Sequence, residues 1–208
     1  MSDNFIIRKL GLCDYLETWE AMKSFTKNRQ AETQDELWIL EHKPVFTLGT
    51  NGKREHVLDS GDIPIVNIDR GGQVTYHGPG QLVIYLLLNL HRRKLGVRKL
   101  VSIIEDSIIQ LLASYQIKAL NDPKAPGVYI DGKKVAALGL RVSRGYTTHG
   151  MSLNVDMDLS PFSGINPCGY ENLEVIQCRD LGITSPLPQL ADELVSLLQE
   201  QLPAAVIN

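Results

Sequence analysis

The sequence is poor in cysteine and has no long apolar run, and each shortage excludes a class of protein. Its 208 residues include only three cysteines, Cys13, Cys168 and Cys178, none with the CxxC spacing of a zinc or redox site. This scattered set disfavours a disulfide framework and predicts free thiols in a reducing cytoplasm. The longest apolar run, residues 82–90, is about half of the roughly 18 residues that span a membrane. The N-terminal MSDNFIIRKLG also lacks the apolar core of a secretory signal. We therefore expect neither a membrane span nor a signal peptide.

Charge of one sign is not in excess either. The formal net charge of −3 predicts no general attraction to nucleic acid or to an anionic membrane. The histidines do not show the i, i+4 arrangement of a metalloprotease, so we expect no bound metal. The one concentrated positive run, residues 91–94 with Arg98 and Lys99 nearby, is either a solvated face or a docking site for an acidic protein.

What the sequence does have is the composition and periodicity of one globular domain, which we place at residues 1–208. Hydrophobic residues make up 43% of the chain and charged residues 22%, which are ordinary globular values. The spacing of apolar residues predicts helices after Asp14, at 97–115 and at 187–202. Strands are predicted at 5–10, 37–40, 45–48, 63–68, 81–90, 127–130, 134–142 and 152–159. Because strands come in runs with few helices between them, we expect an α+β fold with a mixed or antiparallel sheet and packed helices.

The stretch DRGGQVTYHGPG, residues 69–80, is predicted to be a loop that leads into the buried strand at 81–90. Its glycines let a ligand approach the backbone, and the planar guanidinium of Arg70 suits a carboxylate, phosphate or carbonyl group. Thr75, Tyr76 and His77 add hydrogen-bond donors beside it. The stretch matches neither a P-loop nor a dinucleotide-binding fingerprint. It is therefore either a ligand-binding loop or a glycine-rich turn before a strand.

Cys168 is the cysteine most suited to chemistry. It stands between Pro167 and Gly169, where one backbone torsion is fixed and the next is free, so its side chain can be exposed at a sharp bend. Free cysteines are more often buried and inert, which is our expectation for Cys13 and Cys178. His77 and His149 stand beside glycines and could partner Cys168, or they could be structural histidines.

Two lysines follow the turn Asp131-Gly132, which predicts a two-residue hairpin of type I′. Lys133 and Lys134 point to opposite faces of the following strand, and both faces are apolar. One lysine could therefore point where water is scarce, or both could reach solvent at the turn. If Lys134 faces inward beside an anion, it is a charge partner or a proton carrier.

Three blocks of sequence, in a fixed order, resemble the lipoyl(octanoyl) transferase family. They are RGGQVTYHGPGQLVIYLL, GKKVAALGLRVSRGYTTHGMSLNVDMDL and FSGINPCGY, and they span residues 70 to 170. The resemblance implies a fold like the catalytic domain of lipoate and biotin protein ligases. It also implies transfer of an octanoyl group from acyl carrier protein to one lysine of a lipoyl domain. The acceptors would be E2 subunits of 2-oxoacid dehydrogenases and the glycine cleavage H protein.

The resemblance also assigns roles to residues. It implies that Cys168 is the acyl-thioester nucleophile and that Lys134 lowers its pKa. It implies a substrate pocket lined by Arg70, Gly71, Gly72, Gln73, Val74, Thr75, Tyr76, His77, Ala137, Leu138, Gly139, Gly150, Met151 and Ser152. Because a thioester already carries the activation, no cofactor is expected.

Three rival functions remain open from the sequence. An ATP-dependent lipoate or biotin ligase would share the fold but would not need a cysteine at position 168. A cysteine hydrolase or amidase would use Cys168 with His77 or His149 and would need no acceptor protein. An acyl-binding module would do no chemistry and would tolerate the loss of Cys168.

Overall fold

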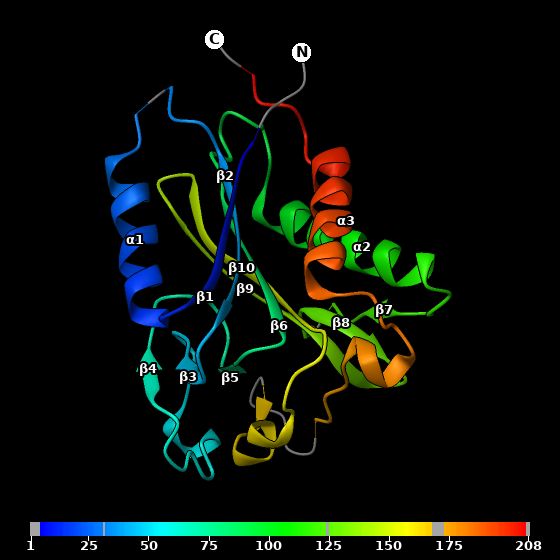
Figure 1. Ribbon diagram of the computed structural model, residues 1–208. Helices are drawn as coiled ribbons and strands as arrows, with labels where there is room; N and C mark the ends of the chain where they lie inside the picture. Colours follow the sequence, from blue (N-terminus) through cyan, green and yellow to red (C-terminus); the bar gives the residue numbers. More distant parts are fainter. Residues whose placement is uncertain (1–4, 31, 124, 168–172, 207–208) are drawn as a thin grey trace.

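The computed structural model describes residues 5–30, 32–123, 125–167 and 173–206. Its largest feature is a seven-stranded sheet with the order β1-β2-β6-β10-β9-β8-β7 (Figure 1). The strands are β1 (Ile6–Cys13), β2 (Glu36–His42), β6 (Gln81–Leu87), β10 (Tyr146–Asn154), β9 (Lys133–Ser143), β8 (Gly127–Ile130) and β7 (Leu120–Asn121). Strands β1 and β2 pair in parallel, and the other pairs are antiparallel. The expected α+β fold with a mixed sheet is therefore confirmed.

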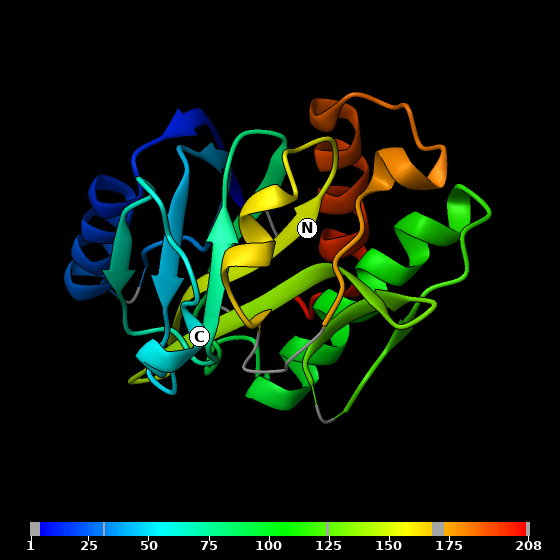
Figure 2. The same ribbon diagram turned by 90° about the horizontal axis from the view of Figure 1, so that it is seen from below.

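Helices cover both faces of this sheet, as Figure 2 shows from below. Helices α2 (Val97–Ser114) and α3 (Leu187–Gln201) pack on one face, and α1 (Tyr15–Asn28) lies on the other. Along β6, Leu82, Ile84 and Leu86 belong to the core beneath α2 and α3, while Val83 and Tyr85 share a core with Met22 of α1. Both side-chain sets of β6 are therefore buried, which explains its nearly continuous apolar sequence. No helix among the described residues is long and apolar enough to cross a membrane.

Local sequence signals account for the ends of several elements. The Asp14 side chain accepts hydrogen bonds from the backbone N–H groups of Leu16 and Glu17, and so caps α1 as predicted. Asp131 and Gly132 have φ angles of 48° and 81°, the two positive values that a type I′ turn requires.

A smaller three-stranded sheet packs beside the first, with the order β4-β3-β5. It consists of β4 (Ile65–Asn67), β3 (Val45–Leu48) and β5 (Val74–His77). Strand β5 lies inside the glycine-rich stretch, so the prediction of a loop across residues 69–80 was wrong for its middle. Tyr76 explains the error, because it packs against Phe46 and Phe162 in the core of the small sheet. One strand between two glycine pairs gives too short a pattern to detect.

The strand predicted at 152–159 was wrong in position, because β10 ends at Asn154. Val155 and Met157 are buried in two different hydrophobic clusters. The alternation of apolar residues here therefore comes from an irregular segment that contributes side chains to both clusters, and not from a strand. The backbone N–H groups of Val155 and Asp156 donate to the carbonyl of Gly80 and do not continue the ladder. The first half of β10 escaped prediction because its sequence, YTTHG, has no alternation of apolar and polar residues.

Candidate active site

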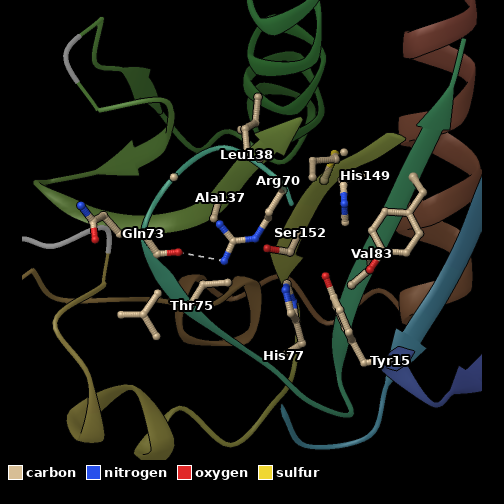
Figure 3. A pocket seen from close by; sticks show the side chains of 16 residues that line it. Tyr15, Arg70, Gln73, Thr75, His77, Val83, Ala137, Leu138, His149 and Ser152 are labelled. Atoms are coloured by element: carbon tan, nitrogen blue, oxygen red, sulfur yellow. Dashed lines mark hydrogen bonds between the residues drawn. The ribbon is translucent and has the colours of Figure 1, made fainter. Parts of the chain in front are cut away.

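A pocket opens between the glycine-rich stretch, β9, β10 and the start of α1 (Figure 3). About 490 Å³ lies between its lining atoms, a volume that includes solvent at the open mouth. All the residues expected to bind substrate line it except Gly71 and Tyr76. Gly71 instead donates its N–H to the carbonyl of Leu140, and Tyr76 faces the small-sheet core.

Four further lining residues were not predicted as substrate-binding residues: Tyr15, Val83, Tyr85 and His149. The sequence identified Val83 and Tyr85 only as part of a buried strand, and Tyr15 only as the start of a helix. A hydroxyl at Tyr85 inside an apolar run was the one usable signal, since a buried hydroxyl needs a partner. It finds one in Nε2 of His42, 2.7 Å away.

Arg70 crosses the pocket with its guanidinium held by neutral oxygens of the surrounding loops. Its Nη2 donates to the carbonyl and hydroxyl of Thr47 and to the carbonyl of Gln73, at 2.8 to 3.0 Å. The last of these bonds is the dashed line in Figure 3. A Cβ at position 139 would lie 2.8 Å from Cδ of Arg70, so glycine there makes room for the arginine. Arg70 thus shapes the pocket wall by tying β3 to the glycine-rich stretch.

Three glycines of the glycine-rich stretch are also required by the fold. A Cβ on Gly80 would collide with the carbonyl of Asp156, and one on Gly78 would collide with the ring of Tyr76. Gly72 has a φ of 93°, which disfavours any other residue. The crowding of glycines is therefore explained by close packing of the chain on itself at Gly78 and Gly80.

His77 is a neutral side chain in the pocket floor. Its Nδ1 lies 2.7 Å from Oε1 of Gln81, so Nδ1 carries the proton that it donates to this acceptor. Burial lowers the pKa of His77 to about 3. A base this weak is poorly suited to proton transfer at neutral pH.

His149 is held in the pocket wall by Asp69. Its Nε2 lies 3.0 Å from Oδ1 of Asp69, which also accepts from Trp19 Nε1, while Arg141 pairs with Oδ2. The hydrogen bond from His149, with help from Trp19 and Arg141, lowers the pKa of Asp69 to about 2. Burial lowers the pKa of His149, so we take it as neutral with Nε2–H on the carboxylate. Its buried Nδ1 has no hydrogen-bond partner among the described residues and is left as an acceptor.

Lys134 lies on β9, three residues before the pocket residue Ala137, and is buried, with 3% of its surface exposed. Its Nζ donates to the carbonyl of Pro126 at 3.4 Å and lies 5.1 Å from the centre of the Tyr129 ring. Lys133, in contrast, is exposed and pairs with Glu174. The alternative that both lysines reach solvent is therefore wrong, and Lys134 is the one that faces inward.

The predicted nucleophile, Cys168, lies outside the described residues, so its proximity to Lys134 stays a prediction. The chain before it is fixed where Asn166 N–H donates to the carbonyl of His56 at 2.8 Å. After residue 172 the chain runs alongside Lys134, whose N–H donates to the carbonyl of Glu174 at 2.9 Å. Cys178 is fully buried, and burial raises its pKa to about 12, as suits the inert thiol expected there.

Comparisons with known proteins agree with the sequence motifs. A family model described as the lipoyl protein ligase A/B catalytic domain matches residues 14–199. The octanoyltransferase of Chromobacterium violaceum is 57% identical over 197 residues, which cover 95% of both chains. That of Shewanella sediminis is 55% identical over 94% of this chain and 90% of its own. The chain belongs to the octanoyltransferase family.

Solved structures of this family's wider fold superpose well on the chain. Lipoate-protein ligase A bound with ATP gives a TM-score of 0.78 at 14% identity, covering 99% of this chain and 90% of the ligase. Biotin protein ligase from Aquifex aeolicus gives 0.61 at 17% identity, covering 96% of this chain and 70% of its own. At such low identities these likenesses concern the fold alone, and they confirm the expected ligase-like architecture.

One hypothesis about the surface needs correction. Arg92 and Arg93, in the run considered for docking an acidic protein, point inward to the carboxylate of Asp35. Arg29 and Arg93 both pair with Asp35, and all three side chains are only 1% exposed. These two arginines of the run are therefore structural, and only its exposed members, such as Arg98 and Lys99, remain available to a partner.

Among the described residues, no group of three or more His, Cys, Asp or Glu side chains is placed to hold a metal ion.

Proposed function

We propose that the protein transfers an octanoyl group from octanoyl-acyl carrier protein to the target lysine of lipoyl domains. The observation that carries this proposal is identity of 57% to an octanoyltransferase across 95% of both chains. The ligases share the fold at only 14% to 17% identity, which favours the transferase over the ATP-dependent rival. Acceptors would be the lipoyl domains of 2-oxoacid dehydrogenase E2 subunits and the glycine cleavage H protein, in the cytoplasm. Nucleic acid, a membrane surface and a cofactor have no part in this proposal.

The pocket supports the binding of a short acyl chain. Val74, Val83, Leu138 and Met151 supply apolar surface, and the glycines at 139 and 150 keep the wall thin. Apolar burial of a chain of eight carbons contributes about 0.8 kcal/mol for each buried CH₂. We assign the pocket residues of the glycine-rich stretch, of β9 and of β10 to this acyl group.

The proposed chemistry begins with the Cys168 thiolate and the Lys134 ammonium. An ammonium group at contact distance favours the thiolate and lowers the cysteine pKa. The thiolate attacks the donor's thioester carbon, a new C–S bond forms, and the carrier leaves as its thiolate and takes up a proton. The acceptor lysine amine then attacks the Cys168 thioester, which forms an amide and releases the Cys168 thiolate.

The second step requires a base for the proton of the incoming amine. Lys134 serves as this base once it is neutral, since lysine ammonium groups release protons readily when buried. His77 is a weaker choice, because its pKa is lowered to about 3. Transfer from a thioester to an amine is downhill, so the sequence of steps needs no ATP.

Intact mass spectrometry tests the proposal. Incubation with octanoyl-acyl carrier protein, without acceptor or ATP, should leave one octanoyl group on Cys168 that hydroxylamine removes. Cys168→Ala should abolish the adduct, while Cys13→Ala should keep it. An absolute requirement for ATP would support the ligase, and release of free octanoate would support the hydrolase. Unchanged turnover by Cys168→Ala would overturn the nucleophile assignment.

The proposed role of Lys134 is tested by alkylation of Cys168 with iodoacetamide across a range of pH. The midpoint should lie well below the free-thiol pKa of roughly 8.5. Lys134→Met should raise it by at least about one unit, because the charge is removed while much of the volume stays. Lys134→Arg should keep part of the acylation but lose more of the transfer, since a guanidinium does not release its proton. An unmoved midpoint in Lys134→Met would remove this lysine from the mechanism.

A further inference from the structure

A buried series of hydrogen bonds runs from the pocket to Lys134. His77 Nδ1 donates to Gln81 Oε1 at 2.7 Å, and Gln81 Nε2 donates to Asn154 Oδ1 at 3.0 Å. Asn154 Nδ2 donates to the carbonyl of Ile176 at 3.0 Å. Ile176 N–H in turn donates to the carbonyl of Lys134 at 3.0 Å. Two side chains, Gln81 and Asn154, therefore stand between the pocket residue His77 and the chain beside Lys134, and Asn154 is the one that contacts this chain.

The direction of every bond in this series is fixed by the backbone groups at its ends. The carbonyls of Tyr76 and Ile176 can only accept, so they orient the NH₂ groups of Gln81 and Asn154. The amide oxygen of Gln81 then faces His77, whose Nδ1 must carry the proton. Gln81 and Asn154 are both nearly inaccessible to water, so the series has no solvent to replace a lost partner.

Ile176 belongs to the segment that follows residues 168–172. Val175 bridges in parallel to Lys134, and Glu174 and Ile176 bond to the N–H and carbonyl of Lys134. Lys134 itself lies at an irregular point of the sheet, where the β8–β9 register shifts between Val128 and Tyr129. The amide of Asn154 thus adds a side-chain anchor to a pairing that the regular ladder does not provide.

We infer that Asn154 is a positioning residue for acyl transfer. It holds the segment 173–176 against Lys134, and through Gln81 it fixes the proton of His77 in the pocket. This inference rests on the proposed function, because its purpose is to hold the chain that leads away from Cys168 in register with the Lys134 ammonium. Asn154 does not line the pocket and acts only through its two neighbours.

The decisive variant is Asn154→Leu, which keeps a branched side chain of similar length and removes both hydrogen bonds. The matched control is Thr147→Val, on the same strand and about 23 Å away at the usual rise. Thr147 is fully buried, accepts from the N–H of Leu88 and donates to the carbonyl of Leu86. Each variant therefore removes two hydrogen bonds made by a side chain of β10. Only Asn154→Leu removes a bond to the segment beside Lys134.

The measurement is the pH midpoint of Cys168 alkylation, followed by peptide mapping. We expect Asn154→Leu to raise the midpoint by at least about half a pH unit, which means roughly threefold less Cys168 thiolate at any pH below the midpoint. Thr147→Val should leave the midpoint unchanged. The inference is overturned if Asn154→Leu leaves the midpoint in place. It is also overturned if Thr147→Val moves the midpoint as far, because general loosening then explains the shift.

Gln81→Leu separates the two contacts of the Asn154 side chain, one with Gln81 and one with Ile176. It breaks the link to His77 but leaves the bond from Asn154 to Ile176, so it should raise KM for the acyl donor and shift the midpoint less than Asn154→Leu. An equal shift would contradict anchoring through Ile176. The wild-type protein distinguishes this failure from a failure of the proposed function. If the midpoint of the wild-type protein is near 8.5, Lys134 does not stabilise the Cys168 thiolate. The positioning role of Asn154 is then disproved as well.

Discussion

Two aspartates of this chain, Asp35 and Asp69, each have three side-chain partners, yet their surroundings differ. Asp35 is enclosed by Arg29, Arg92 and Arg93, and its side chain is 1% exposed. The Asp69 carboxylate accepts from Trp19 and His149 and forms an ion pair with Arg141, and its side chain is 28% exposed.

The difference shows which buried charges serve the fold and which serve the site. The Asp35 cluster joins distant parts of the chain, since Arg93 also donates to the carbonyl of Pro203, and it lies outside the pocket lining. Asp69 holds His149, which does line the pocket. Removing Asp35 should therefore weaken the whole molecule, whereas removing Asp69 should first disturb the pocket.

The largest effect is expected from Asp35→Ala. Loss of one partner from a buried charge network leaves guanidinium groups without their carboxylate, which costs about 3–5 kcal/mol. Urea unfolding at pH 7 should show this loss in the free energy of unfolding. Asp35→Asn, which keeps hydrogen-bond acceptance through its oxygen, should be milder. A loss below about 1 kcal/mol in Asp35→Ala would mean that the cluster does not stabilise the fold.

The next largest effect is a loss of stability in acid, caused by histidines buried in and near the pocket. Burial lowers the pKa of His42 to about 4 and that of His77 to about 3, against about 6.5 in an unfolded chain. The unfolded chain therefore binds more protons below pH 6.5, so stability is full above that pH. Each histidine should remove about 1.4 kcal/mol per pH unit as the pH falls toward its folded pKa.

Unfolding measured from pH 7 to pH 4 checks this sign. His42→Gln should lower the stability at pH 7 and flatten the slope below pH 6.5, since one of the buried histidines no longer titrates. Stability that rises as the pH falls from 6.5 to 4 would contradict the neutral assignment of these histidines.

A smaller effect is expected from Asp69→Asn. The amide keeps the size of the side chain but holds Nε2–H of His149 less strongly, so the ring can turn in the pocket wall. We expect kcat/KM for the acyl donor to fall about tenfold, or about 1.4 kcal/mol, mostly through KM. The free energy of unfolding should change by less than in Asp35→Ala. Equal destabilisation with unchanged kinetics would erase the distinction between the two aspartates.

The sequence predicted the parts of this comparison that local patterns control. The helix at 97–115 was found almost to the residue, because its apolar stripe and α2 coincide. The turn at Asp131-Gly132 followed from turn chemistry. Strand alternation, in contrast, left open whether either of the two following lysines points inward, and the fold decides this in favour of Lys134. Arg92 and Arg93 could not be placed, since a run of cations looks the same whether or not a distant aspartate pairs with it.

The site shows the same limit. Residues on the glycine-rich stretch, β9 and β10 converge on one pocket. The family motifs predicted fourteen lining residues there, and all of them line it except Gly71 and Tyr76. Tyr15 and Tyr85 were missed because their role depends on the packing of α1 over β6, which no short window contains. The series through Asn154 joins β5, β6, β10 and the segment beside Lys134, so only the folded chain reveals it.

The smallest effect on stability is expected on the exposed part of the positive run, where Arg98→Glu and Lys99→Glu should change the free energy of unfolding by no more than about 0.5 kcal/mol. Arg93→Glu serves as the contrast, because it places two carboxylates together in the interior. If the exposed cations dock the acidic carrier protein, the paired reversal at 98 and 99 should raise KM for octanoyl-acyl carrier protein and flatten its salt dependence. Turnover of a short octanoyl-pantetheine thioester should stay the same, since it lacks the carrier surface. Equal kinetic losses on both donors would show that these cations only solvate the surface.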